Sequence, residues 1–231
     1  MKKYLYFLLP ISILVVFTVY TILVKTVDVH YLNVGNFYLG FYSMNTTVNS
    51  WLAYDKADTM KKLSDAILYL SFAFVLAYAI LGVYQLVKRK SLKEVDPRLY
   101  VLLGTYALVV IIYAIFEIAK INYSPIIGED GAIKASYPST HVFVSDVFFI
   151  TGTVIALSFI NNKKKYLVVL TYVLLVILAL VIGFVRLLSG QHWLSDIIAS
   201  YILTGFVISL FVYFFKKYEP KEKEEATPKA E

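Results

Sequence analysis

The stretch VRLLSGQHWLSD, from Val185 to Asp196, carries an arginine, a histidine and an aspartate between two long apolar runs. His192 and Asp196 are four residues apart, so a helix that begins near His192 places them one turn apart on the same face. Asp196 is then expected to accept a hydrogen bond from one ring nitrogen of His192, which leaves the other as a base or nucleophile. An ordinary helix N-terminus with a polar histidine and a capping aspartate fits the same spacing. The pair alone therefore does not distinguish a catalytic role from a structural one.

Arg186 adds a cation to this pair. It ends the apolar run before the short link LLSGQ, and it precedes His192 by six residues. The link includes Gly190 and brings the ends of two helices together. A guanidinium beside an oriented imidazole is suited to a phosphate group. Ionisable residues embedded in a membrane are functional candidates by default, so these residues predict phosphate chemistry.

A second polar cluster, ASYPSTHVFVSD, opens another apolar run with Pro138, Ser139, Thr140 and His141. Proline favours the first position of a helix, and the free backbone N–H groups of the first turn attract anions. His141 is then placed to protonate a leaving oxygen. An ordinary helix N-terminus with a polar histidine is the alternative, but two such clusters on one face make coincidence a weaker explanation.

The elements that position these residues are long apolar segments. The chain of 231 residues is 59% hydrophobic, with a mean hydropathy of +0.70, and a helix needs about 20 apolar residues to cross a bilayer. Only helices or closed barrels satisfy every backbone group in lipid, and these runs are too long for barrel strands. We therefore predict an all-α, polytopic membrane protein with six transmembrane helices. The runs are Tyr4–Val24, Ala66–Val87, Leu99–Phe116, Val147–Asn162 (or from Val142 if Asp146 is tolerated), Tyr166–Val185 and Ile197–Phe215.

The first run follows the basic start MKK, but it is longer than the apolar part of a signal peptide and no small-x-small cleavage site follows it, so we expect a retained helix. With both termini in the cytoplasm, 15 of the 22 Lys and Arg residues fall in the inner segments 1–3, 88–98, 161–165 and 216–231. This bias predicts that the histidine clusters lie on the extracytoplasmic face. The net charge of +6 is then a topology signal rather than a nucleic-acid footprint.

We predict one membrane domain, residues 1–217, with a long outer loop over residues 25–62, followed by a charged, disordered cytoplasmic tail over residues 218–231. The aromatic-rich outer loop either lies at the lipid headgroups or caps the helices. His30, in this loop, has no partner pattern and is expected to be structural. The chain has no cysteine, which excludes disulfides and thiol chemistry.

The two clusters resemble the motifs of the type 2 phosphatidic acid phosphatase (PAP2) superfamily, which are KxxxxxxRP, PSGH and SRxxxxxHxxxD. Residues 138–141 match the second motif with Thr140 in place of glycine. Arg186, His192 and Asp196 keep the spacing of the third motif, with Val185 in place of its serine. The resemblance implies a PAP2-like helical bundle with its motifs on one face.

The first motif is where the sequence departs from the family. An alignment on Lys120 puts Ile127 and Gly128 in place of Arg-Pro, and an alignment on Pro125 puts Ser124 and Glu117 in place of Arg and Lys. Either way, one phosphate-binding arginine of the family is absent. Each charged hydrogen bond that it would make to the phosphate contributes about 1.5–3 kcal/mol to binding. The candidates to replace it are Lys120 and Lys134. Two further acidic residues are expected to be structural: Glu117 as an ion pair with Lys120 or Arg186, and Asp146 as a polar packing contact.

The resemblance implies a metal-independent phosphoester hydrolase that uses no cofactor. His192 would attack phosphorus and form a phosphohistidine, Asp196 would orient His192, and His141 would protonate the departing oxygen. The phosphoryl oxygens would be held by Arg186, Ser139, Thr140, backbone N–H groups and Lys120. No carboxylate cluster with magnesium-type spacing is present in the sequence.

The expected partners are the bilayer and a lipid phosphate, and nucleic acid is not among them. Bacterial proteins of this family dephosphorylate undecaprenyl diphosphate, phosphatidylglycerophosphate or phosphatidate, and an outward site favours the first. Two alternatives stay open. The same histidines would serve a lipid phosphotransferase, and the absent arginine would suit a catalytically weak lipid-phosphate binding protein or a small transporter.

Overall fold

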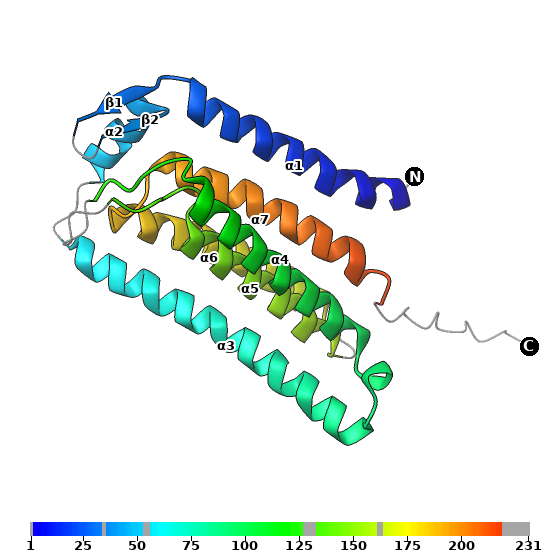
Figure 1. The fold of residues 1–231 in the computed structure, drawn as a ribbon. Coiled ribbons are helices and arrows are strands. Elements are labelled where there is room, and N and C mark those ends of the chain that lie inside the picture. Colours follow the sequence, from blue (N-terminus) through cyan, green and yellow to red (C-terminus); the bar gives the residue numbers. More distant parts are fainter. Residues whose placement is uncertain (1, 34–35, 53–55, 127–132, 161–163, 219–231) are drawn as a thin grey trace, which may run out of the picture.

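The computed structural model describes residues 2–33, 36–52, 56–126, 133–160 and 164–218. These residues contain six helices that are long and apolar enough to span a membrane, which confirms the predicted number. Figure 1 shows these helices side by side in one bundle, with a small hairpin and a short helix at one end. The elements are α1 (Lys2–Thr26), β1 (His30–Leu32), β2 (Phe37–Leu39), α2 (Tyr42–Trp51), α3 (Ala57–Arg89), the 3-10 helix η1 (Leu92–Glu94), α4 (Pro97–Ala119), α5 (Thr140–Ser158), α6 (Lys165–Leu188) and α7 (Leu194–Phe215).

Local chemistry sets several of the helix boundaries. The Asp96 side chain accepts a hydrogen bond from the Arg98 backbone N–H at 2.9 Å, and Pro97 takes the first helical position of α4, as predicted. At the end of α3, Lys90 adopts a left-handed conformation with φ 56°. The same helix starts nine residues before its predicted apolar run, at Ala57 rather than Ala66, because a polar N-terminal extension continues the helix beyond the apolar stretch.

The fourth span tolerates Asp146, so the longer of the two predicted apolar runs, from Val142, is the one that the helix contains. Its helix, α5, begins at Thr140, and Asp146 lies inside it. Ser139 is the residue at the N-cap position, so Pro138 precedes the cap instead of taking the first helical position. The reason is burial, since Asp146 is enclosed by neighbouring helices and does not end the helix at a solvent boundary.

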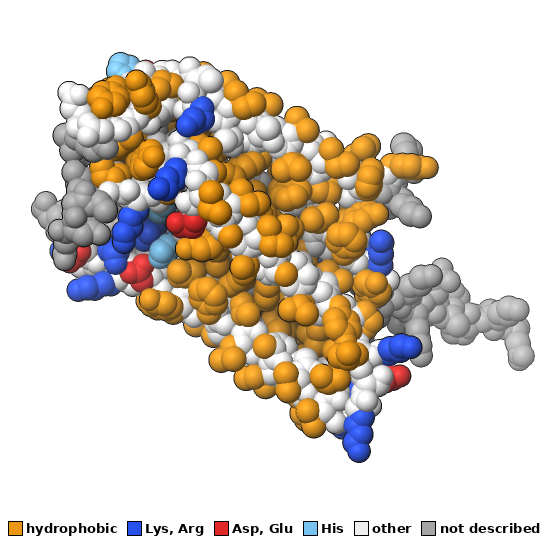
Figure 2. All heavy atoms as spheres, viewed as in Figure 1, with side chains coloured by type: hydrophobic (Ala, Val, Ile, Leu, Met, Phe, Trp, Pro, Cys, Tyr) orange, Lys and Arg blue, Asp and Glu red, His pale blue; other side chains and the backbone are white. Residues whose placement is uncertain are grey.

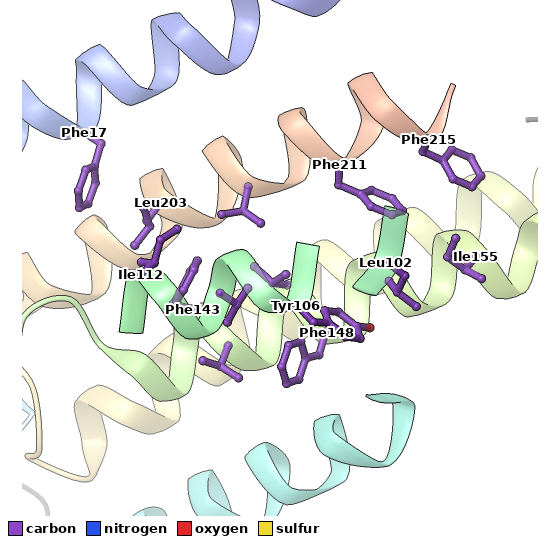
Figure 3. Packing of buried hydrophobic residues seen from close by; sticks show 14 of the residues in the cluster. Phe17, Leu102, Tyr106, Ile112, Phe143, Phe148, Ile155, Leu203, Phe211 and Phe215 are labelled. Atoms are coloured by element: carbon purple, nitrogen blue, oxygen red, sulfur yellow. The ribbon is translucent and has the colours of Figure 1, made fainter. Parts of the chain in front are cut away.

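The central helix of the bundle is α5, which packs against α3, α4, α6 and α7. Figure 3 shows Phe143 and Phe148 of this helix in the core with Tyr106 of α4 and Leu203 of α7. A fully buried aromatic side chain contributes about 1.5–3 kcal/mol in water, but in lipid the gain comes from close packing rather than from leaving water. This central position holds the N-terminus of α5 fixed against its neighbours.

Large hydrophobic side chains are exposed along the outer helices α1, α3 and α6. Figure 2 shows them covering the flank of the bundle, while Lys and Arg side chains gather near its two ends. A soluble protein rarely exposes so continuous an apolar surface. The chain is therefore a multi-pass membrane protein, and its exposed flank faces lipid.

The connection over residues 25–62 contains structure that the sequence did not predict. Strands β1 and β2 form an antiparallel hairpin with His30 opposite Leu39, and α2 follows. Phe37 and Leu39 are buried against Trp193, the residue before α7. The hairpin therefore covers the start of α7, in agreement with the alternative that this segment caps the helices. His30 of the hairpin is exposed beside Tyr42 and Asp28.

Candidate active site

The two predicted polar clusters meet at the hairpin end of the bundle. The backbone N–H of Ser139 donates to the backbone oxygen of Asp196 at 3.3 Å. The Ser200 hydroxyl donates to the backbone oxygen of Ser139 at 3.0 Å, one turn further along α7. These bonds fasten the N-terminus of α5 to that of α7, so residues more than 50 positions apart in the chain share one site.

His192 lies two residues before the first residue of α7 and is buried. Its Nδ1 is 2.8 Å from the backbone oxygen of Ser136. A carbonyl oxygen only accepts, so Nδ1 carries the proton and donates it. The ring is therefore fixed in one tautomer, and Nε2 keeps its lone pair.

The expected hydrogen bond between Asp196 and the His192 ring is not the one that the structure contains. The nearer carboxylate oxygen of Asp196 is 3.6 Å from Nδ1, beyond hydrogen-bond distance but close enough for an ionic interaction. The same oxygen accepts from the Trp193 backbone N–H at 3.1 Å, and the other accepts from the Asn122 amide at 3.2 Å. Asp196 is thus both the cap of α7 and a buried negative charge beside His192.

His141 lies in the first turn of α5, and its Nε2 is 2.9 Å from a carboxylate oxygen of Asp65 on α3. The same oxygen is 3.7 Å from the Arg186 guanidinium at the end of α6. The other oxygen is 3.1 Å from the Lys61 ammonium, one turn earlier on α3. One carboxylate therefore joins an imidazole and two cations at the mouth of the site.

The hydroxyl of Ser139 is buried and has no hydrogen-bond partner among the described residues. Thr140, the first residue of α5, is half-buried beside it. The first-turn N–H groups of a helix have no partner within the helix and attract anions. Of the predicted phosphate ligands, Ser139, Thr140 and Arg186 thus lie around one helix N-terminus.

Burial lowers the pKa of His192 below its usual range, because an imidazolium is poorly solvated there. The Asp196 carboxylate opposes this shift, and the Arg186 charge adds to it. Burial has the larger effect, so the pKa of His192 remains lowered. The ring is consequently neutral near pH 7, the state in which Nε2 is a nucleophile.

Two apolar grooves lie away from these residues, one of about 390 Å³ between α4 and α7 and one of about 320 Å³ between α3 and α4. Their lining includes Pro97 and Leu86, which belong to the opposite end of the helices. No charged side chain of the described residues lines either groove. We therefore place the polar chemistry at the histidines and not in these grooves.

Comparison with known proteins agrees with the motifs. The family model of the PAP2 superfamily matches residues 66–220, more than half of the chain. The chain belongs to the PAP2 superfamily. Among solved structures, it is similar to a transmembrane PAP2-type phosphatidylglycerolphosphate phosphatase from Bacillus subtilis, with a TM-score of 0.59 and 18% identity over 94% of this chain and 98% of that one. At this identity the likeness shows a shared fold, and no curated protein gives a significant match.

The loop that should hold the first PAP2 motif lies beside the third. The Ser124 hydroxyl donates to the backbone oxygen of Gln191 at 3.2 Å, next to His192. Ile127 and Gly128 fall outside the described residues. Lys120 ends α4 in a left-handed conformation and is exposed, and Lys134 is also exposed. Within the described chain, neither lysine forms a hydrogen bond or ion pair through its ammonium group, and the role of either lysine as a phosphate ligand stays a prediction.

The acidic residues expected to be structural behave differently from the prediction. Glu117 is exposed on α4 and forms no ion pair with Lys120 or Arg186 among the described residues. Asp146 is buried in α5, and neither of its carboxylate oxygens has a hydrogen-bond partner within the described part of the chain. Asp146 is therefore enclosed by packing without a polar partner, and Arg186 pairs with Asp65 instead of Glu117.

Four site residues were missed from the sequence: Lys61, Asp65, Asn122 and Ser136. Lys61 and Asp65 stand just before an apolar run, where ionisable side chains lie at the edge of the membrane. That signal was available, but nothing in it selects His141 as the partner, 76 residues away. Ser136 acts through its backbone oxygen, for which a sequence carries no signal.

Proposed function

We propose that this PAP2 protein is a membrane phosphatase that hydrolyses a lipid phosphate or diphosphate through a phosphohistidine on His192. The observation that supports this most is the ring of His192, buried and held at Nδ1 by the Ser136 carbonyl with Nε2 left unprotonated. The same ring lies within the electrostatic influence of the Arg186 guanidinium, the cation that would hold a phosphoryl group in front of it. Phosphoryl transfer depends mainly on such positioning and on charge neutralisation.

In the first step, Nε2 of His192 attacks phosphorus while the bond from phosphorus to the lipid oxygen breaks. His141 donates the proton that the departing oxygen takes up. The Arg186 guanidinium, the Ser139 hydroxyl and the N-terminal amides of α5, including that of Thr140, neutralise the phosphoryl oxygens. The products are the dephosphorylated lipid and a phosphohistidine.

In the second step, water attacks the phosphohistidine, and its proton passes to His141. The bond between phosphorus and Nε2 breaks, and inorganic phosphate leaves. The imidazolium character of His192 is greatest while phosphorus is attached, and the Asp196 carboxylate at 3.6 Å stabilises that charge. Asp196 thus acts mainly through charge, since the Ser136 oxygen already orients the ring.

The substrate is a lipid phosphate whose head lies at the hairpin end of the bundle and whose tails lie among the lipid-facing helices. With both termini cytoplasmic, this end is extracytoplasmic, which favours undecaprenyl diphosphate. The similar solved protein is a phosphatidylglycerolphosphate phosphatase, so phosphatidylglycerophosphate is the second candidate and phosphatidate the third. The cationic side chains around the phosphate perform the work that a metal ion performs elsewhere, so the reaction is metal-independent and needs no cofactor.

The test is phosphate release by purified protein in excess EDTA from undecaprenyl diphosphate, phosphatidylglycerophosphate and phosphatidate. The matched variants are His192→Ala and His30→Ala, the second removing an exposed histidine of the hairpin. Release that is lost in His192→Ala and retained in His30→Ala supports the proposal, and the fastest lipid gives the substrate.

The remaining outcomes separate the alternatives. Phosphate that appears on an added lipid alcohol instead of in solution indicates a phosphotransferase. Equal release by wild type and His192→Ala would remove the nucleophile, and saturable binding without turnover would indicate a binding protein. Activity that is lost in EDTA and returns with a divalent metal would overturn the metal-independent mechanism.

A further inference from the structure

Four residues form what we call the Asp65 cluster: Lys61, Asp65, His141 and Arg186. Asp65 lies 2.9 Å from His141, 3.1 Å from Lys61 and 3.7 Å from Arg186. Its carboxylate is thus surrounded by the groups that would otherwise face an anion. Its side chain is 27% exposed, so it lies at the mouth of the site and not in its floor.

The donors around the cluster exceed what one carboxylate can satisfy. The Nε of Arg186 is buried without a hydrogen-bond partner among the described residues, and so is the hydroxyl of Ser139. A second guanidinium nitrogen has only long contacts among the described residues, 3.5 Å to the Ser64 hydroxyl and 3.7 Å to the Asp65 carboxylate. A phosphoryl group carries more acceptor oxygens than a carboxylate and offers partners to such groups.

The position of Asp65 also conflicts with the proposed reaction. Nε2 of His141 donates its proton to a hydrogen bond with the Asp65 carboxylate. The proposed reaction needs that same N–H group to face the leaving oxygen of the substrate. A phosphate and a carboxylate on the same donors would repel each other, because both groups are negatively charged and would lie side by side. Substrate and Asp65 therefore cannot share the site in the arrangement that the structure has.

We propose that Asp65 occupies the place of the substrate phosphate, that substrate binding displaces it, and that Lys61 then becomes a phosphate ligand. The inference rests on the proposed function for its substrate class. It concerns residues that lie before position 66, where the family match begins. Lys61 supplies from α3 the cation that the altered first motif lacks, since its ammonium group already lies 3.1 Å from the carboxylate that contacts His141 and Arg186.

The place of Lys61 and Asp65 near the start of α3 leaves their side chains room to change partners. Lys61 and Asp65 lie in the first turns of α3, ahead of the apolar run, and the Lys61 side chain is 46% exposed. A lysine is a compact charge on a flexible stem, so it follows an anion that enters at the mouth of the site. Displacing Asp65 breaks its contacts with His141 and Arg186, whose side chains are 22% and 7% exposed, and the phosphate oxygens replace those contacts with their own.

The experiment measures the Kd of inorganic phosphate by calorimetry on protein in nanodiscs, for wild type, Asp65→Asn and Asp58→Asn. Asp58 is an exposed acid on the same helix, and among the described residues it forms no ion pair, so its variant controls for net charge. We expect Asp65→Asn to bind phosphate about tenfold more tightly or better, and Asp58→Asn to bind as wild type does. Asp65→Ala, judged by its Tm, serves if the asparagine variant is unstable.

The role of Lys61 is read in the Asp65→Asn background, where its ion pair is already gone. There, Lys61→Gln should weaken phosphate binding about tenfold, while Lys62→Gln, on the adjacent and exposed lysine, should not. An equal effect of both lysines would show a diffuse charge effect and overturn the assignment.

Other outcomes are equally decisive. A Kd in Asp65→Asn that equals the wild-type value, with a lowered kcat, would make Asp65 a positioning residue for His141 and overturn the proposal. No phosphate binding by any variant would overturn it as well. If phosphate binds more tightly to Asp65→Asn but no lipid phosphate is turned over, this inference stands and the proposed hydrolase function fails.

Discussion

Nδ1 of His192 donates a hydrogen bond to the backbone oxygen of Ser136 across 2.8 Å, and Asp196 lies further from the ring. A backbone oxygen cannot lose its orienting role by protonation or by side-chain substitution. The tautomer of the candidate nucleophile is therefore fixed by the fold of the segment before α5. This leaves Asp196 two separate tasks, capping α7 and placing a negative charge near the ring.

We expect His192 to remain neutral at pH values where an ordinary histidine is protonated. Burial lowers its pKa, so the neutral form should persist as the pH falls through about 6.5, the usual value. The chain has only three histidines, which makes the measurement practical by ¹⁵N NMR of histidine-labelled protein. His192→Gln assigns the signal, and the neutral ring should show its proton on Nδ1. A midpoint above 6.5 would contradict the prediction.

Asp196→Asn should lower kcat by about ten- to a hundredfold, because the loss of a charged interaction of about 1.5–3 kcal/mol appears in the barrier. The ring itself should stay in place, since the Ser136 oxygen still holds it. Turnover and the NMR tautomer of His192 are measured on the same sample. A wild-type kcat would reduce Asp196 to a helix cap, and a changed tautomer would restore it as the orienting group.

Asn45 on α2 should be important for stability although it is remote from the chemistry. Its side chain is fully buried, accepts from the Ser195 backbone N–H at 3.0 Å and donates to the Gly40 oxygen at 2.9 Å. Asn45→Ala leaves these groups unsatisfied, so we expect a loss of about 2–4 kcal/mol of unfolding free energy, seen as a lower Tm. Asn49→Ala, at an exposed residue one turn further along the same helix, is the control. Equal Tm values for both variants would show that the hairpin and α2 do not stabilise the start of α7.

The orientation in the membrane can be tested without background, because the chain has no cysteine. Ser50→Cys places a thiol on α2 at the hairpin end, and Lys93→Cys places one in η1 at the opposite end. A membrane-impermeant maleimide added to intact cells should label the first and should reach the second only after permeabilisation. The reverse pattern would put the histidines on the cytoplasmic face.

The sequence by itself determined the class of the protein and half of the site. Apolar runs of about 20 residues must be helical in lipid, because no other open structure satisfies the backbone there. Arg186, His192 and Asp196 come together because a single short link joins their two helices, so their spacing already encodes their proximity. Local signals such as Pro97 after Asp96 placed a helix start correctly.

Only the tertiary structure decided which groups meet across the bundle. Asp65 reaches His141 over 76 positions and Asn122 reaches Asp196 over 74, through the packing of α3 on α5 and of the loop after α4 on α7. The orienting acceptor for His192 is a backbone oxygen, which any residue type supplies, so no pattern of side chains announces it. Spacing along the chain specifies neighbours on one helix or one link, whereas partners on different helices depend on how the whole bundle packs.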